Sequence, residues 1–557
     1  MIPHFYSVFT FLLIAPELAA ETYLDLKRKT NSTIRGTRGN LNNHYRWLDQ
    51  ERKAKDDFAS IALQSYKGCR RNNKERPQTC FPRDPKIFLS RPDCQNECSS
   101  GVHLAPGKDA ARSMTVSFAV DFTCGMQKVK DAFVIIGTDP SDLRRPGIAE
   151  MVVKQYNSTA CLAEDPHECI AKTSHSCTPS HFDLYVSDNF VHFTAYNLSP
   201  GTTYYYTTFP PPCSHDSEVL DDTSIIGDDG ERIFKFKTAP DYSGAVVTFA
   251  VLADTEKTPD ADITFQTLHE TSHHIDAIII PGDMVYSNRD QRIWDNWLKD
   301  YEALFGSKPL IVAAGNHDQD TDCCDWSTFK GYENRFQMPQ IRDPHMRPSC
   351  QATSPSSIHN YGAYDFGNAF YSVIFGPVHV IVLNTYTEIG SDSPQYDWFH
   401  DELRAVDRKK TPWLFVVAHA NIYGVFKRHK DEVPQVQMKQ SLERLFIKHN
   451  VNFFFSGHDH AYSRTLPVAK GKKRKHAPIY ITIGNTGRLH DDGISKEEPW
   501  LASYNYWSLG FGTISVLNET HALWETSFHQ RGSYEKIPGT DHAYIENSLH
   551  FSSFDTH

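Results

Sequence analysis

The chain has 557 residues, of which 39% are hydrophobic and 22% are charged, and its formal net charge is −11. A single hydrophobic core stops growing at roughly 250–300 residues, so we expect at least two domains. The acidic balance argues against a protein that binds nucleic acid through its phosphates, because such proteins carry a surplus of Lys and Arg.

The N-terminus carries an apolar run from Phe5 to Ile14, followed by small residues at Ala19 and Ala20. A membrane helix needs roughly 20 apolar residues, so this shorter run predicts a signal peptide over residues 1–20, with a buried N-terminal strand as the less favoured alternative. The 12 cysteines suit an oxidising compartment. Sequons for N-linked glycosylation occur at Asn31, Asn157, Asn197 and Asn518. We therefore expect a glycoprotein that is secreted or retained in a lysosome-like or vacuole-like compartment.

Residues 21–100 form an N-terminal extension that contains several cysteines. They are Cys69, Cys80, Cys94 and Cys98. Spaced cysteines can bind zinc, but no histidine cluster accompanies these, so disulfides are the favoured interpretation. A second group comprises Cys323, Cys324 and Cys350. A disulfide to Cys350 would close a loop there, and the adjacent cysteines leave its partner open.

Between residues 101 and 240 the sequence changes to short alternating runs rich in Val, Thr, Phe and Tyr. The runs are 114–120, 131–137, 190–196, 202–209 and 232–238. Turn residues separate these runs, and the pattern is typical of an antiparallel β-sandwich. The region contains no cluster of side chains that could carry catalysis.

From residue 241 onward fully apolar runs alternate with helical stretches such as 291–304 and 436–449. The apolar runs are 246–254, 275–283, 310–318, 378–385, 413–419, 450–460 and 479–484. Continuous apolar strands between helices predict an α/β fold whose sheets are covered on both faces. In such folds the ligand site lies at the carboxyl ends of the strands. The basic run Lys472–Lys475 is better interpreted as a solvated hairpin loop than as a nuclear signal.

The ends of these strands carry polar residues that can bind metal ions. They are Asp254, Asp283, Tyr286, Asn316, His419, His458 and His460, and His317 follows Asn316 directly. Two ions about 3.5–4 Å apart need a bridging ligand, for which Asp283 after a glycine turn is the natural candidate. The ordinary pKa of a tyrosine is about 10, so a tyrosinate ligand requires a strongly Lewis-acidic ion. Tyr286 therefore points to ferric iron.

The order of these motifs resembles the metallophosphoesterases and, within them, the purple acid phosphatases. The five blocks DxG, GDxxY, GNH(D/E), VxxH and GHxH follow one another from residue 254 to 460, and the resemblance covers about residues 100–530. It implies a layered α/β/β/α metallophosphoesterase sandwich over 241–530, preceded by a fibronectin-III-like β-sandwich over 101–240, with 531–557 as a C-terminal tail. The first block departs from the pattern, because Glu256 replaces a glycine. A solvated loop acid is the favoured interpretation of Glu256, and an extra carboxylate near the site is the alternative.

The resemblance also implies roles for the strand-end residues. An Fe(III) ion would be bound by Asp254, Asp283, Tyr286 and His460. A divalent ion (Zn, Mn or Fe) would be bound by Asp283, Asn316, His419 and His458. His317 would stabilise the developing charge or protonate the leaving group, His429 would orient the substrate, and Arg428 stands where some members have another histidine. Asp318 is a candidate partner that fixes a neighbouring side chain.

The implied activity is that of an acid phosphatase, which hydrolyses phosphate monoesters by direct attack of a metal-bound hydroxide on phosphorus. A phosphodiesterase or nucleotide pyrophosphatase on the same metal core is one alternative, and a non-enzymatic secreted binding protein is another. We expect a phosphate ester as the partner, with no nucleic acid and no membrane, while the oligomeric state is left open.

Overall fold

The structure is a computed structural model, and it describes residues 98–121, 129, 131–161, 182–212, 224–226, 232–288, 290–320, 328–340, 364–490, 493–537 and 541–547. The predicted signal peptide and the predicted disulfide to Cys350 lie outside these ranges and stay predictions. Within the described ranges, every helix falls short of the length and apolar character that crossing a membrane would require.

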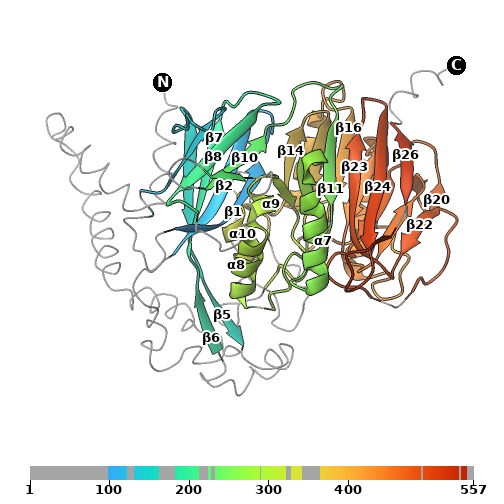
Figure 1. The fold of residues 1–557 in the computed structure, drawn as a ribbon. Helices are drawn as coiled ribbons and strands as arrows, with labels where there is room; N and C mark the ends of the chain where they lie inside the picture. Colours follow the sequence, from blue (N-terminus) through green and yellow to red (C-terminus); the bar gives the residue numbers. More distant parts are fainter. Residues whose placement is uncertain are drawn as a thin grey trace, which may run out of the picture.

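Two antiparallel sheets of four strands open the described chain (blue to green in Figure 1). The first has the order β1 (Ser99–Pro106), β2 (Ser113–Val120), β7 (Asn189–Tyr196), β4 (Ala149–Lys154), and the second β3 (Phe133–Gly137), β8 (Thr203–Phe209), β10 (Arg232–Lys237), β9 (Ser224–Ile226). Their inner faces share one core, in which Val116 and Phe118 pack with Tyr206 and Phe234. All five predicted strands are present. The fibronectin-III-like assignment stays a prediction.

Two sheets of seven strands follow (Figure 1). The first contains β13 (Leu310–Val312), β12 (Ala277–Ile280), β11 (Val247–Val251), β23 (Leu509–Val516), β24 (His521–His529) and β25 (Lys536–Ile537), with β26 (His542–Glu546) also paired to β24. The second has the order β14 (Tyr371–Phe375), β15 (Val378–Val382), β16 (Trp413–Val417), β17 (Phe453–Ser456), β21 (Ile479–Ile483), β18 (Tyr462–Thr465), β22 (Leu501–Asn505). The seven predicted apolar runs correspond to β11, β12, β13, β15, β16, β17 and β21, which pair in parallel within each sheet.

The two large sheets pack face to face, and helices cover their outer sides. Phe249 of β11 contacts Phe375 and Phe415 of the second sheet, with ring centroids 5.2 and 6.0 Å apart. Because successive strand side chains point to opposite faces, Leu414 of β16 turns the other way and packs with Phe446 of α12 (Val433–Lys448). This burial on both faces explains the continuous apolar runs, and the layers follow the order helix, sheet, sheet, helix.

The helices begin and end where local side chains permit it. α7 (Pro259–Glu270) is capped by Thr258, whose hydroxyl accepts a hydrogen bond from Ala261 N, and α11 (Pro394–Ala405) is capped in the same way by Ser393. The helix predicted over 291–304 is divided at Tyr301 into α8 (Gln291–Asp300) and α9 (Glu302–Phe305). α12 begins three residues earlier than predicted, since Pro434 suits a first helical turn.

Helix α10 (Lys330–Arg335) joins the sandwich to the large sheets through its last residue. The Arg335 side chain is fully buried, and its Nη2 donates to Asp295 Oδ1 of α8 at 2.7 Å and to the Tyr185 hydroxyl at 2.9 Å. Tyr185 lies in a two-stranded ribbon of β5 (Asn157–Cys161) and β6 (Phe182–Val186). A second polar link is the hydrogen bond from the Tyr206 hydroxyl to Gly306 O, at 2.6 Å.

Two surface predictions have clear outcomes. The run Lys472–Lys475 lies on an exposed hairpin of β19 (Val468–Ala469) and β20 (Lys472–Lys473), which confirms the solvated-loop interpretation. The predicted C-terminal tail is partly wrong, because β26 completes a sheet edge beside β24. Asp541, just before β26, accepts two hydrogen bonds from Arg464 of β18, at 2.7 and 2.9 Å.

Candidate metal centre

The loops that follow β11, β12, β13, β16 and β17 meet at one edge of the two large sheets and bring the predicted ligands together. Backbone hydrogen bonds join neighbouring loops, from Asp254 N to Gly282 O at 3.2 Å and from Gly457 N to His419 O at 2.9 Å. Parallel strands present their carboxyl ends on the same side, so residues far apart in sequence converge here.

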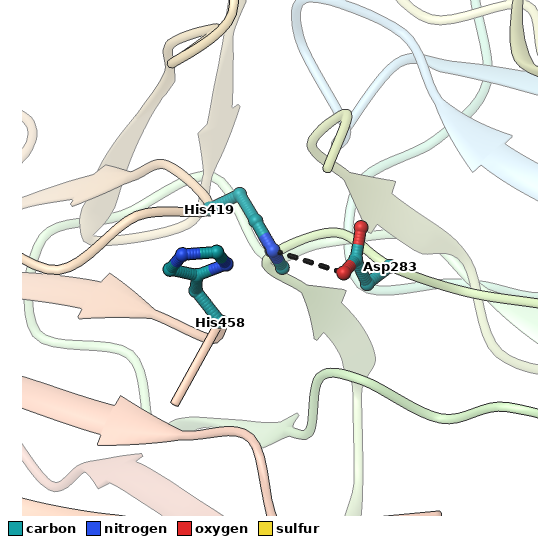
Figure 2. Close-up of side chains that lie close together, drawn as sticks. All are labelled: Asp283, His419 and His458. Atoms are coloured by element: carbon teal, nitrogen blue, oxygen red, sulfur yellow. Dashed lines mark ion pairs between the residues drawn. The ribbon is translucent and has the colours of Figure 1, made fainter. Parts of the chain in front are cut away.

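Asp283 and His419 form the middle of the site (Figure 2). His419 Nε2 lies 3.2 Å from Asp283 Oδ2, and His419 Nδ1 lies 2.8 Å from the carbonyl oxygen of Pro281. A carbonyl oxygen can only accept, so Nδ1 carries a proton and Nε2 faces the carboxylate. Burial disfavours a charged imidazole, but the Asp283 and Asp254 carboxylates raise the pKa of His419 to about 9. The two carboxylates thus create a negative field that favours a cation at this point.

A second group of predicted ligands surrounds Tyr286. Its hydroxyl lies 2.9 Å from Asp254 Oδ1 and 2.7 Å from His460 Nε2. Burial, together with the Asp254 and Asp283 carboxylates, holds the pKa of Tyr286 well above its ordinary value. Loss of the phenol proton therefore needs a strong Lewis acid. Among the described residues, no group hydrogen-bonds the buried Nδ1 of His460.

Asn316 and His458 complete the set. Asn316 Oδ1 lies 3.1 Å from both His419 Nε2 and His458 Nδ1, and the Tyr386 hydroxyl donates to it at 3.0 Å. Asp283, His419 and His458 each offer one ligand atom within 4.8 Å of the others (Figure 2). The donors are carboxylate, amide and phenol oxygens together with imidazole nitrogens, which suits one hard and one intermediate metal ion. The residues present therefore fit a binuclear centre.

The backbone around these ligands is unusual. Asp254, Asp283, Tyr286 and His458 all have positive φ, at 55°, 53°, 50° and 71°. Such conformations cost roughly 1–3 kcal/mol each and tend to occur at functional sites. Glycine is required at position 315, where a Cβ atom would lie only 2.1 Å from Asp283 Oδ1.

Asp318 stabilises this backbone, which differs from the expectation that it fixes a side chain. Its carboxylate accepts hydrogen bonds from the backbone N–H groups of Asp283, Met284 and Gly315, at 2.8, 3.0 and 2.8 Å. Burial, and then the charge of Asp283, raise the pKa of Asp318 to about 7. The interaction joins the loop after β12 to the loop after β13.

The two predicted catalytic histidines lie on different sides of the ligand cluster. The His317 ring contacts the Tyr286 ring with centroids 4.1 Å apart and planes tilted by 32°, and the His317 backbone N donates to Asp283 Oδ1 at 2.7 Å. The His429 ring lies 4.1 Å from the His458 ring, and its Nδ1 is 2.7 Å from Glu432 Oε1. Burial opposes charging of His429, but Glu432 raises the pKa of its imidazole.

The departure at Glu256 has a structural explanation, and the solvated-acid interpretation is wrong. The Glu256 side chain is only 14% exposed, and its carboxylate forms an ion pair with Arg488 at 2.5 Å. Its backbone has positive φ, at 47°. Gly487 opposite provides the space, since a Cβ atom there would lie 2.2 Å from Thr255 O.

Two residues beside the ligands, Glu432 and His490, were not predicted from the sequence. Glu432 Oε2 lies 2.8 Å from His458 Nε2, so one carboxylate holds both His458 and His429. The His490 ring stacks on the His460 ring, with centroids 4.0 Å apart and planes at 19°. His490 follows the apolar strand β21 in a Gly-Arg-Leu-His sequence, so a search for histidines just after strands would have found it.

Two segments of the chain match models of known protein families. Residues 247–462 match the family model described as Calcineurin-like phosphoesterase, and residues 477–533 match the model described as Iron/zinc purple acid phosphatase-like protein C. The fold and the site thus define a metallophosphoesterase.

Individual relatives identify the family within the metallophosphoesterases. Purple acid phosphatase 22 of Arabidopsis thaliana is 30% identical over 69% of this chain and 78% of its own length, and purple acid phosphatase 21 of the same plant is 31% identical over 66% and 74%. The purple acid phosphatase PPD1 from yellow lupin seeds shares the fold, with a TM-score of 0.58 at 16% identity over 82% of this chain and 75% of that one. The chain belongs to the purple acid phosphatase family, whose members use a binuclear metal centre, and it is an acid phosphatase.

Proposed function

We propose that this acid phosphatase hydrolyses phosphate monoesters at a binuclear centre of one ferric and one divalent ion, and that it works in the secretory pathway or outside the cell. The observation that carries the proposal is the convergence of ligand atoms from Asp283, His419 and His458 within 4.8 Å. All seven predicted ligand positions hold residues that can coordinate a metal, which argues against a vestigial site.

The proposed ligand sets follow the two groups of side chains. Asp254, Tyr286 and His460 would hold the ferric ion, and Asn316, His419 and His458 the divalent ion. Asp283 lies between the groups and would bridge them. When bound, the two ions would supply Lewis acidity that activates a water molecule and neutralises charge on the phosphate.

The chain's own residues would orient the ester and move the proton. His317 stands beside Tyr286 and Asp283, where its imidazole can donate a hydrogen bond to the phosphate or to the departing oxygen. His429, held by Glu432, would fix the substrate from the opposite side. The side chains on both flanks would stabilise charge that develops during the reaction.

Metal analysis and a visible spectrum of the purified protein test the ferric assignment. We expect iron with one further metal and a visible tyrosinate-to-iron absorption band, which Tyr286→Phe should remove while the protein stays folded. Iron without such a band in the wild-type protein would refute the assignment.

The substrate class is tested by comparing p-nitrophenyl phosphate with bis(p-nitrophenyl) phosphate at acid pH. We expect the monoester to have the larger kcat/KM. A preference for the diester would instead support a phosphodiesterase on the same metal core.

A further inference from the structure

The hairpin of β19 and β20 concentrates positive charge on a protein whose net charge is −11. Five of the six residues from Lys470 to Lys475 are cationic, and their side chains are exposed. None of these five side chains makes an ion pair with any residue in the described ranges. Like charges close together on a strand pair repel one another and therefore destabilise the free hairpin. A bound anionic partner would relieve this repulsion.

The hairpin is fixed in place by contacts with the catalytic region. Lys470 N donates to Glu443 Oε1 of α12 at 2.7 Å, and Gly471 N donates to the Tyr423 hydroxyl at 2.9 Å. Tyr423 is almost fully buried and also donates to Glu443. The charges are therefore presented on a defined turn (β20 at the right-hand edge of Figure 1).

A cleft links this turn with the loop that carries His429. Its volume is about 280 Å³, and both Gly471 of the hairpin and Lys430, the residue after His429, line it. Lys439 also lines the cleft, where its Nζ lies 3.9 Å from the centre of the Tyr423 ring. The acidic residues in the lining are Asp431 and Glu498, and Glu498 is ion-paired with Lys496 at 3.4 Å.

We propose that the basic hairpin and this cleft bind the flanking acidic groups of a multiply phosphorylated polypeptide while one of its phosphates occupies the metal centre. The inference rests on the proposed monoesterase function and names its substrate class. The His429 ring lies 4.1 Å from the ring of the proposed ligand His458, and the next residue, Lys430, lines the cleft, so the cleft begins beside the centre. An extended peptide advances about 3.3–3.6 Å per residue, so neighbouring residues of one peptide can carry phosphates to adjacent sites of this kind. Exposed charge pairs are individually weak and screened by salt, so the effect depends on several of them together.

Two synthetic peptides provide the test. One carries four consecutive phosphoserines, and the other carries one phosphoserine flanked by alanines. The variants are K472Q/K473Q and the fourfold K472Q/K473Q/R474Q/K475Q, with K409Q/K410Q as the matched control, because Lys409 and Lys410 are also an exposed lysine pair. Phosphate release is followed at acid pH and low ionic strength.

For the wild-type protein we expect a lower KM for the clustered peptide than for the single one. K472Q/K473Q should raise that KM about threefold and the fourfold variant about tenfold, with kcat unchanged. The single-phosphate peptide and the control variant should stay within about twofold of the wild type. Raising NaCl from about 50 to about 300 mM should remove the wild-type preference.

The proposal is overturned if the wild-type protein shows no preference, or if the fourfold variant keeps it. It is also overturned if the hairpin variants lose binding of a sulfated glycan but keep the wild-type preference for the clustered peptide. The hairpin would then serve a glycan and not a phosphorylated peptide. Hydrolysis of the single-phosphate peptide without any preference would leave the monoesterase function intact, whereas failure to hydrolyse either peptide or p-nitrophenyl phosphate would reject that function itself.

Discussion

Two buried polar clusters in this molecule are built in opposite ways. Around Arg335, at the end of helix α10, one guanidinium group contacts Asp295 and the hydroxyls of Tyr156 and Tyr185. At the metal centre, two fully buried carboxylates, Asp254 and Asp283, lie on backbone with positive φ. The first cluster neutralises its charge internally, while the second gathers negative charge and metal-ligating nitrogen atoms.

The difference shows what distinguishes a site from a structural ion pair. Burial and shifted pKa values occur in both clusters, and neither identifies function by itself. The metal centre adds strained backbone, two buried carboxylates without a Lys or Arg counter-ion among the described residues, and donors from five separate loops. A cation would offset the charge of the two carboxylates, whereas the charge of Arg335 already has a counter-ion in Asp295.

The largest effect that would test this contrast is expected from Asp283→Ala. Removal of the proposed bridging ligand should abolish metal loading and phosphatase activity together. The loss should exceed the roughly 10–100-fold that is typical when a residue hydrogen-bonded to a metal ligand is replaced. Metal content and the rate of phosphate release, measured on the same preparation of protein, report the two losses. Asp401→Ala, on an exposed turn of α11, is the control and should behave as the wild type. Normal turnover by Asp283→Ala would reject the two-metal site.

Arg335→Met is the corresponding change in the structural cluster. Loss of one partner leaves Asp295 and two tyrosines without their cation, so we expect a loss of about 3 kcal/mol in the free energy of unfolding. Urea denaturation measures this loss, and activity per folded molecule should not change. The double variant Arg335→Met with Asp295→Leu should recover part of the stability, and a catalytic defect in the folded single variant would contradict a purely structural role.

His317→Ala separates metal binding from turnover within the site. The ring touches Tyr286 but is not a proposed ligand, so metal content should persist while kcat falls about 10²–10³-fold. His273→Ala changes an exposed histidine and should have no effect on either quantity. If His317→Ala lost its metals, the residue would belong to the ligand set instead.

Much of the fold was predictable because the buried strands have no polar face. β16 and β17 lie between two apolar layers, so their sequences are continuously hydrophobic and end abruptly at His419 and before His458. Parallel pairing then brings these ends together. The division of the predicted helix at Tyr301 was not predictable, since no glycine or proline marks it.

The unpredicted parts of the site depend on contacts between distant segments. Glu432 reaches His458 across 26 residues, and Arg488 reaches Glu256 across 232 residues. Neither pair has a fixed spacing or a local pattern, because loop packing alone brings the partners together. Sequence therefore indicated the proposed ligands, which follow strands, but not the side chains that hold them.

The buried carboxylate of Glu402 gives the smallest and most specific test. It accepts hydrogen bonds from the Ser372 hydroxyl at 2.6 Å and from His379 Nε2 at 3.0 Å, and Lys108 Nζ lies 3.4 Å away. Burial alone would raise the pKa of Glu402, but His379, Ser372 and Lys108 lower it to about 2. Because its charge is offset by neighbouring side chains, as at Arg335, Glu402 should contribute to stability and not to catalysis.

A carboxylate with a lowered pKa stabilises the fold above its unfolded pKa of about 4.3, and this contribution is lost as pH falls towards 2. Glu402→Gln should therefore cost about 1–2 kcal/mol at pH 7, nearly as much at pH 5, and much less at pH 3. Urea midpoints at these three values measure the trend, with the exposed Glu270→Gln as control. Equal losses at pH 7 and pH 3 would show that Glu402 acts through packing. A cluster that remains ionised at pH 5 keeps its stabilising effect under the acid conditions in which an acid phosphatase works.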